Sequence, residues 1–234
     1  MTRLLKTGLW RRAILPMLML AGYVPQAQAE IILSQVIIDL QPDRPDYQDI
    51  EIWNSASERA FVQVEPSEIL QPGLPAERRE RIVDPERGGL LVSPQRLVLE
   101  PDERRIIRIA AIAARGEQER IYRVAVRPVA GDVGMETTGL KVLLGYDMLV
   151  LLRPAVLKGD VTAIRRSGAI EFTNNSNFAH EIYDGKQCNE QGDACVNLPS
   201  TRLYPGASWS VPLPYPTRVD VMLSAGSSPV RKSY

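Results

Sequence analysis

The sequence is poor in the residue types that metal sites and nucleic-acid-binding surfaces need. It has one histidine, His180, and two cysteines without Cys-x-x-Cys spacing, so little material is available for a zinc site. The formal net charge is zero, which removes the usual electrostatic argument for binding nucleic acid. Three phenylalanines stand against eighteen prolines, a balance that favours turns and strand edges over a helical bundle. These shortages argue against a metalloenzyme and against a nucleic-acid-binding protein.

Catalytic motifs are also missing from the sequence. It contains no Gly-x-Ser-x-Gly nucleophile elbow, no P-loop and no Gly-x-Gly-x-x-Gly motif. A pair of carboxylates could form a glycosidase site, but few aromatic residues are present to line a sugar site. We therefore expect no enzyme, no catalytic residues, no metal and no cofactor.

Residues 1–29 have the organisation of a signal peptide. An apolar stretch over residues 13–24 is too short to span a bilayer, is interrupted by Pro16, and is followed by the small residues of Ala27-Gln28-Ala29. Its basic residues are Arg3, Lys6, Arg11 and Arg12. Cleavage after Ala29 leaves 234 − 29 = 205 residues with a formal charge of 24 − 28 = −4. We expect an exported protein that does not insert into a membrane after cleavage.

Export to an oxidising compartment makes the two cysteines informative. Cys188 and Cys195 have six residues between them in a polar loop, which favours a local disulfide. A redox site is the alternative, but no histidine or helix start lies nearby to lower a thiol pKa. We predict a structural disulfide.

Short segments rich in Ile and Val recur at the spacing of an all-β sandwich. In the first part of the chain they cover residues 31–39, 49–54, 60–64, 90–92, 96–99, 104–110, 120–126 and 140–152. That number of strands fits one immunoglobulin-like domain, over residues 30–153, and Pro154 marks its end. Shorter strands, over residues 160–164, 169–174, 181–183, 201–204, 208–213 and 219–223, predict a second, smaller β domain over residues 154–234. The charged stretch 77–87 is interpreted as a solvated loop, and no internal repeat is evident.

The segment 140–152 is the most informative, because thirteen residues exceed the usual five or six of a strand. On one face, at period two, it carries Leu140, Val142, Leu144, Tyr146 and Met148. An ordinary core strand would show this pattern. An over-long apolar strand at the end of a domain could instead fill a groove of another protein, as in donor-strand complementation.

Several motifs together resemble the periplasmic pilus-assembly chaperones related to PapD, of the chaperone–usher pathway. They are Gly-Gly-Leu-Leu-Val-Ser-Pro-Gln-Arg-Leu-Val-Leu (88–99), Ile-Arg-Ile (107–109), Glu-Arg-Ile-Tyr-Arg-Val (119–124), Leu-Arg-Pro (152–154) and Leu-Tyr-Pro-Gly (203–206). With the Cys188…Cys195 loop, they resemble the alpha-fimbrial class most. The similarity covers nearly the whole mature chain, and the order and spacing of the motifs make it specific.

The resemblance implies two immunoglobulin-like β-sandwich domains in a boomerang arrangement. It also implies a function: a periplasmic chaperone that binds pilus subunits and delivers them to an outer-membrane usher. Subunits lack a final strand, and the chaperone would lend Leu140, Val142, Leu144 and Tyr146 to fill the groove. Burial of each such side chain contributes roughly 1.5–3 kcal/mol.

Two positions depart from the better-known members of the family. An arginine and a lysine that grip the subunit's terminal carboxylate there are replaced here by Gln35 and Leu149. Glu119 and Arg153, by contrast, match the family's interdomain ion pair. We expect that pair to fix the angle between the domains, since a surface pair contributes only about 0–1 kcal/mol to stability.

Two other functions are alternatives to a chaperone. The first is a secreted β-sandwich pilin or adhesin, although this chain begins with a strand that resembles a packed one and not with an extended polar segment. The second, less favoured, is a secreted β-rich hydrolase.

Overall fold

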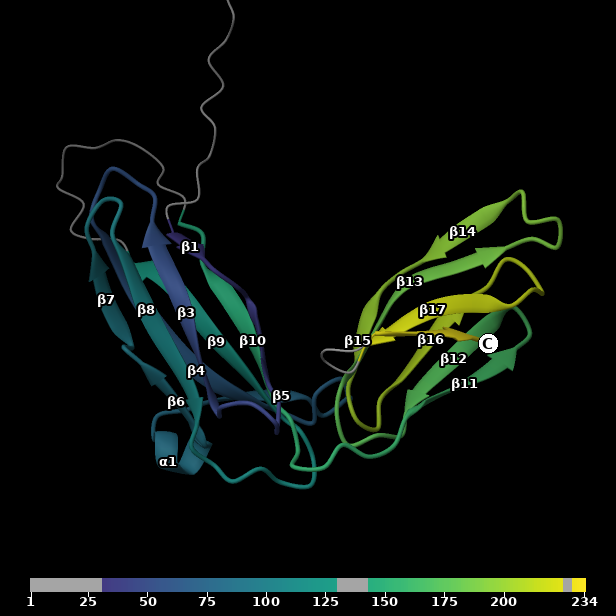
Figure 1. The fold of residues 1–234 in the computed structure, drawn as a ribbon, viewed down its shortest axis with the longest axis horizontal. Coiled ribbons are helices and arrows are strands. Elements are labelled where there is room, and N and C mark those ends of the chain that lie inside the picture. The colour runs from purple at the N-terminus through teal and green to yellow at the C-terminus, as the bar shows by residue number, and fades with distance from the viewer. Residues whose placement is uncertain (1–30, 130–142, 225–228) are drawn as a thin grey trace, which may run out of the picture.

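The structure is a computed structural model that describes residues 31–129, 143–224 and 229–234. These ranges are almost entirely β (Figure 1). Their strands are β1 (Ile31–Leu33), β2 (Ile37–Leu40), β3 (Tyr47–Asn54), β4 (Ala60–Leu70), β5 (Arg78–Arg81), β6 (Leu90–Ser93), β7 (Arg96–Leu99), β8 (Arg104–Ala111), β9 (Arg120–Val129), β10 (Tyr146–Leu152), β11 (Val161–Arg166), β12 (Ala169–Asn174), β13 (His180–Cys188), β14 (Cys195–Leu198), β15 (Thr201–Leu203), β16 (Ser208–Pro212), β17 (Val219–Ser224) and β18 (Val230–Ser233). One helical turn, α1 (Pro85–Gly88), completes the described elements.

The first ten strands form a sandwich of two sheets. One sheet has the order β1-β3-β8-β6, and the other has the order β2-β10-β9-β4-β5, with β7 also paired to β4. Side chains from both sheets fill the core between them, among them Ile50, Ile107, Val124 and Val150, each with no exposed surface. The all-β sandwich expected from the sequence is confirmed for this part of the chain.

Strand β3 shows why these residues form a sheet with one buried face. Ile50 and Ile52 point into the core, while Asp49 and Glu51 alternate with them on the outside. On that outer face Asp49 forms a bidentate ion pair with Arg108 of the neighbouring strand β8, with both N–O distances at 2.7 Å. The alternation of apolar and charged residues therefore fixes both the burial and the register of the strand.

Strands β11 to β18 form a second sandwich. Its sheets have the orders β11-β12-β16 and β14-β13-β17-β18, with β15 paired to β13. Phe172 is fully buried at its centre, stacked on Trp209 and edge-on to Tyr234. The second, smaller β domain expected from the sequence is thus present as a separate core (Figure 1).

The two sandwiches meet at one end and diverge from there, in the boomerang arrangement that the resemblance implies (Figure 1). Pro154 lies between β10 and β11, where the chain passes from one sandwich to the other. No helix among the described residues is long and apolar enough to cross a membrane. The expected signal peptide, residues 1–29, lies outside the described residues.

Two predicted segments differ from the structure. The strand expected over residues 31–39 is two strands, because the chain changes sheets: β1 pairs with β3, whereas β2 pairs in parallel with β10 of the other sheet. The stretch 77–87, expected to be a loop, contains β5 and the first three residues of α1. All four side chains of β5 are exposed, so the segment has no burial period that would identify it as a strand.

Candidate functional site

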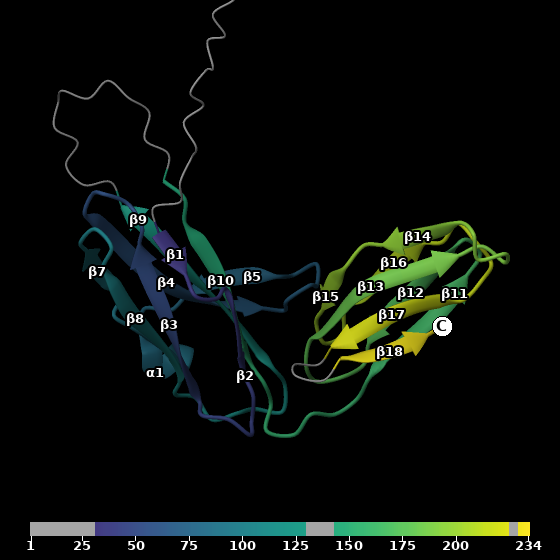
Figure 2. The same cartoon turned by 45° about the horizontal axis from the view of Figure 1, so that its top comes forward.

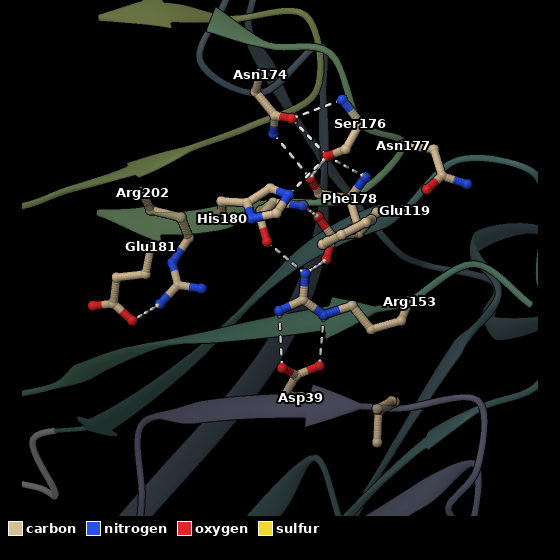
Figure 3. Close-up of polar contacts among 12 residues, drawn as sticks. Asp39, Glu119, Arg153, Asn174, Ser176, Asn177, Phe178, His180, Glu181 and Arg202 are labelled. Carbon is tan, nitrogen blue, oxygen red and sulfur yellow. Dashed lines mark hydrogen bonds and ion pairs between the residues drawn. The ribbon is translucent and has the colours of Figure 1, made fainter. Parts of the chain in front are cut away.

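A buried ion-pair cluster holds the two sandwiches together, and Arg153 is its centre (Figure 3). Its guanidinium donates two hydrogen bonds to Asp39 of β2, at 2.7 and 2.9 Å. Its Nη1 lies 2.8 Å from Oε1 of Glu119 and donates to the carbonyl of Ala179 at 2.8 Å. Arg153 and Asp39 belong to the first sandwich, whereas Ala179 immediately precedes β13 of the second. The guanidinium therefore bonds to both domains at once.

Glu119 completes the cluster from the loop before β9. Its Oε2 accepts a hydrogen bond from the backbone N–H of Ala179 at 2.7 Å, and its side chain has no exposed surface. Burial raises the pKa of Glu119 to about 7, an effect that Arg153 opposes by favouring the carboxylate. The expected Glu119–Arg153 ion pair is present, but it is not the surface pair that we assumed, because both side chains are buried. The estimate of about 0–1 kcal/mol consequently does not apply to it.

His180 lies beside this cluster at the first position of β13, at a strand end as the sequence suggested. Its Nε2 is 3.1 Å from Oγ of Ser176, and its ring packs on Phe178 (Figure 3). Burial lowers the pKa of His180 to about 4, so the imidazole is neutral near pH 7. Its contacts are those of a buried structural histidine.

Two residues of the cluster were not identified from the sequence. Asp39 is the carboxylate that Arg153 binds with two hydrogen bonds. Arg115 donates to the carbonyls of Leu40 and Arg153, each at 2.8 Å, and so joins the ends of β2 and β10. Asp39 could have been noticed in the sequence as the single acidic residue of the apolar run Ile37-Ile38-Asp39-Leu40. Nothing in the sequence indicated the role of Arg115, because these two partners are backbone carbonyls.

The predicted donor segment is described only from Leu143 onward, so Leu140 and Val142 lie outside the described residues. Leu144 is 58% exposed and lies outside any strand, two residues before the first residue of β10. Within the described residues the strand begins at Tyr146, and residues 143–145 before it are not part of a strand, unlike the expected continuous strand. Gly145 marks this break: it has no side chain to continue the alternation, and a Cβ there would lie 3.0 Å from the carbonyl oxygen of Val126.

Tyr146 has partners within its own domain. Its ring packs against the core of the first sandwich, and its hydroxyl donates to the carbonyl of Ile31 at 2.8 Å. Met148, the next residue on the same face, is fully buried in that core. The side chain of Tyr146 therefore already has its partners within the first sandwich.

Gln35 and Leu149, the two positions for which the resemblance implied basic residues, lie in different surroundings. Gln35 is in the unpaired segment between β1 and β2. Leu149 is 5% exposed and packs with Leu151 and Ile121 on the face of the sheet that meets the second sandwich. An apolar side chain at residue 149 thus contributes packing at the junction.

Cys188 and Cys195 form a disulfide that closes the hairpin between β13 and β14. They are paired cross-strand residues at the end of that hairpin. The described residues contain no group of three or more His, Cys, Asp or Glu side chains that could hold a metal ion.

Comparison with solved structures places this arrangement among known folds. The structure of the class 5 fimbriae chaperone CfaA superposes with a TM-score of 0.62, covering 87% of this chain and 98% of that one at 21% identity. The chain has the fold of the fimbrial chaperones. The complex of the Salmonella enterica SafA pilin with the SafB chaperone gives a TM-score of 0.60, at 14% identity over 88% of this chain and 97% of the other. Nearly all of each chaperone is matched, so both sandwiches and their arrangement belong to this fold.

Sequence comparison finds a relative at a similarly low identity. A protein of Escherichia coli described as a CFA/I fimbrial subunit is 24% identical over 202 residues, 82% of this chain and 83% of that protein. No protein-family profile matches the chain. A third structure with the chaperone fold is that of CsuC with the tip adhesion protein CsuE of Acinetobacter baumannii, with a TM-score of 0.58, at 11% identity over 88% of this chain and 98% of the other.

Proposed function

We propose that this protein is a non-enzymatic periplasmic chaperone that binds pilus subunits and passes them to an outer-membrane usher. The observation that carries the proposal is the match of both sandwiches to chaperones described in complex with a pilin or a tip subunit. The basic and apolar organisation of residues 1–29, followed by cleavage after Ala29, would bring the chain to the periplasm.

The proposed client-binding segment is Leu140, Val142 and Leu144, which leads into β10. Leu144 supports it, because this large apolar side chain is exposed on backbone that has no strand partner within the described residues. A segment with free backbone N–H and C=O groups and exposed leucine side chains can pair with an incomplete sheet as an additional strand. The client would gain backbone hydrogen bonds and cover its apolar groove.

Charged substitutions test this assignment. We expect Val142→Glu and Leu144→Glu to abolish capture of the cognate pilin while the melting curve of the purified protein stays unchanged. The reason is that a charge is well hydrated on a free segment but costs several kcal/mol when it is buried unpaired in a groove. Ile106→Glu is the matched control, because Ile106 is also half-exposed but lies on the other sheet.

Either of two results would refute the assignment. A collapsed melting curve for Val142→Glu would place that residue in the protein's own core. A normal melting curve with retained capture would show that the client binds elsewhere. A pilin, the alternative that the name of the Escherichia coli relative suggests, would self-assemble into fibres in the same experiment.

A further inference from the structure

The loop between β4 and β5, residues 71–77 and here called the hairpin tip, reaches the second sandwich. In Figure 2 the strands of this hairpin run toward β15 and end close to it. Leu74 packs against the core of the second sandwich. A Cβ placed on Gly73 would lie 3.2 Å from Cδ2 of Tyr204 and 3.5 Å from Cβ of Ala207. The tip therefore makes a direct contact between the domains, separate from the Arg153 cluster.

The hairpin tip has a defined internal structure. Gln71 and Gly73 both have left-handed backbone conformations, with φ of 53° and 71°. The N–H of Leu74 donates to the carbonyl of Gln71 at 3.2 Å, and that of Glu77 donates to the carbonyl of Leu74 at 2.9 Å. The carboxylate of Glu77 accepts from the N–H of Gly73 at 2.6 Å. A formed turn thus presents Leu74 to the second domain.

The same hairpin is bound back to the first sandwich by an ion pair. Arg79 of β5 donates two hydrogen bonds to Asp147 of β10, at 2.8 and 3.1 Å. Asp147 also accepts a hydrogen bond, at its backbone carbonyl, from Arg123 at 3.3 Å. The pair connects the outermost strand of the sheet to the strand that begins just after Gly145.

The hairpin tip and the Arg153 cluster lie at opposite edges of one sheet. The order of that sheet is β2-β10-β9-β4-β5, with Asp39 on β2 at one edge and the tip at the end of the β4–β5 pair at the other. Between these edges Leu149 and Leu151 pack near Tyr204 of the second domain. Contacts at both edges of the sheet restrain rotation of the domains more than contacts near one edge alone, so the hairpin tip limits rotation about the Arg153 cluster.

We propose that the hairpin tip is a second interdomain tie, anchored by Leu74 and tethered by the Arg79–Asp147 pair, that sets the angle between the sandwiches. This inference does not depend on the proposed chaperone function, because it concerns the free protein. Removing the anchor or the tether widens the range of domain angles, while each domain stays folded.

Spin labels at Gln95→Cys, in the first domain, and Ser167→Cys, in the second, report the angle through the distance between them in pulsed electron resonance. Both residues are exposed. We expect Leu74→Gln and Arg79→Gln each to broaden the distance distribution at least twofold. The matched controls are Ala76→Gln, exposed on the same tip, and Arg78→Gln, exposed on the same strand. Their distributions should equal that of the labelled parent.

An unchanged distribution for Leu74→Gln would overturn the tie. An unchanged distribution for Arg79→Gln, with a broad one for Leu74→Gln, would overturn the tether. Equal broadening in the two controls would also overturn the proposal, because it would reflect general loosening of the hairpin. Fluorescence of Trp209 verifies in each variant that the second domain is folded.

Discussion

Replacing Arg153 with methionine tests how much the buried cluster contributes to stability. Methionine fills a similar volume but leaves the carboxylates of Asp39 and Glu119 without their cationic partner. Asp39 keeps 25% of its side-chain surface exposed and can be hydrated, whereas Glu119 has none. Loss of one partner from a buried ion pair costs about 3–5 kcal/mol. We expect a loss of this size for Arg153→Met, and most of it arises from Glu119, which must then either stay ionised without its partner or bind a proton.

A double-mutant cycle isolates the contribution of the pair. Glu119→Gln alone should cost at most about 1–2 kcal/mol, because Arg153 keeps Asp39 and the amide oxygen still accepts from Ala179. The double variant has no carboxylate at residue 119 that could be left unpaired. Its loss of unfolding free energy should therefore be smaller than the sum of the two single losses by about 2–3 kcal/mol.

Urea unfolding measures these values, with Trp53 in the first domain and Trp209 in the second as fluorescence reporters. Because the cluster joins the domains, we also expect one transition in the parent to separate into two in Arg153→Met. A loss below about 1 kcal/mol for Arg153→Met, or strictly additive losses in the cycle, would refute the reasoning.

Two further predictions concern pH and the disulfide. Because burial raises the pKa of Glu119 from 4.5 to about 7, this group's stabilisation is complete below pH 4.5 and is lost as the pH rises through 7. The free energy of unfolding of the parent, compared with that of Glu119→Gln, should fall by about 2.5 kcal/mol between pH 5 and pH 8, and parallel profiles would contradict this. Replacing both Cys188 and Cys195 with serine should lower the stability of the second domain by about 2–3 kcal/mol, as expected for so short a loop. The change should appear in the unfolding curve of Trp209 and not in that of Trp53, and an equal shift in both would contradict the prediction.

The sequence predicts those strands that bury one face. In β3 and β8 the alternation of isoleucine with charged residues follows directly from the core on one side and water on the other. Strand β5 could not be found in this way, because it is exposed on both faces and is held by pairing with β4 and by the contact of its hairpin with the second domain. Its position depends on residues far away in the sequence.

The Glu119–Arg153 pair was predicted, but its burial was not. Burial depends on Phe178 and Ala179, which belong to the second domain and cover the guanidinium only when both domains are in place. The surroundings of an ion pair decide whether it contributes a few tenths of a kilocalorie or several. Residue types at two positions therefore identify a pair without giving its energy.

A turn built on a buried asparagine occurs in both sandwiches. Asn54 and Asn174, both fully buried, end corresponding strands of the two sandwiches. Each side-chain amide donates to the carbonyl four residues later, at 2.8 and 2.9 Å, and each side-chain oxygen accepts from the N–H two residues later. These partners are backbone groups, so the turn needs the asparagine side chain but no particular residue types at the partner positions.

The two copies of this turn differ in what else they bind. In the second domain the turn includes Asn177, whose amide donates to the carbonyl of Glu117 at 2.6 Å and to that of Val156 at 2.9 Å. Its own carbonyl accepts from the N–H of Glu119 at 2.9 Å. A turn that closes one sandwich thus also positions the loop that carries Glu119. The position of Glu119 in the ion-pair cluster therefore depends on the turn of the second domain that contains Asn177. Next to this turn, the carboxylate of Glu119 accepts a hydrogen bond from the N–H of Ala179.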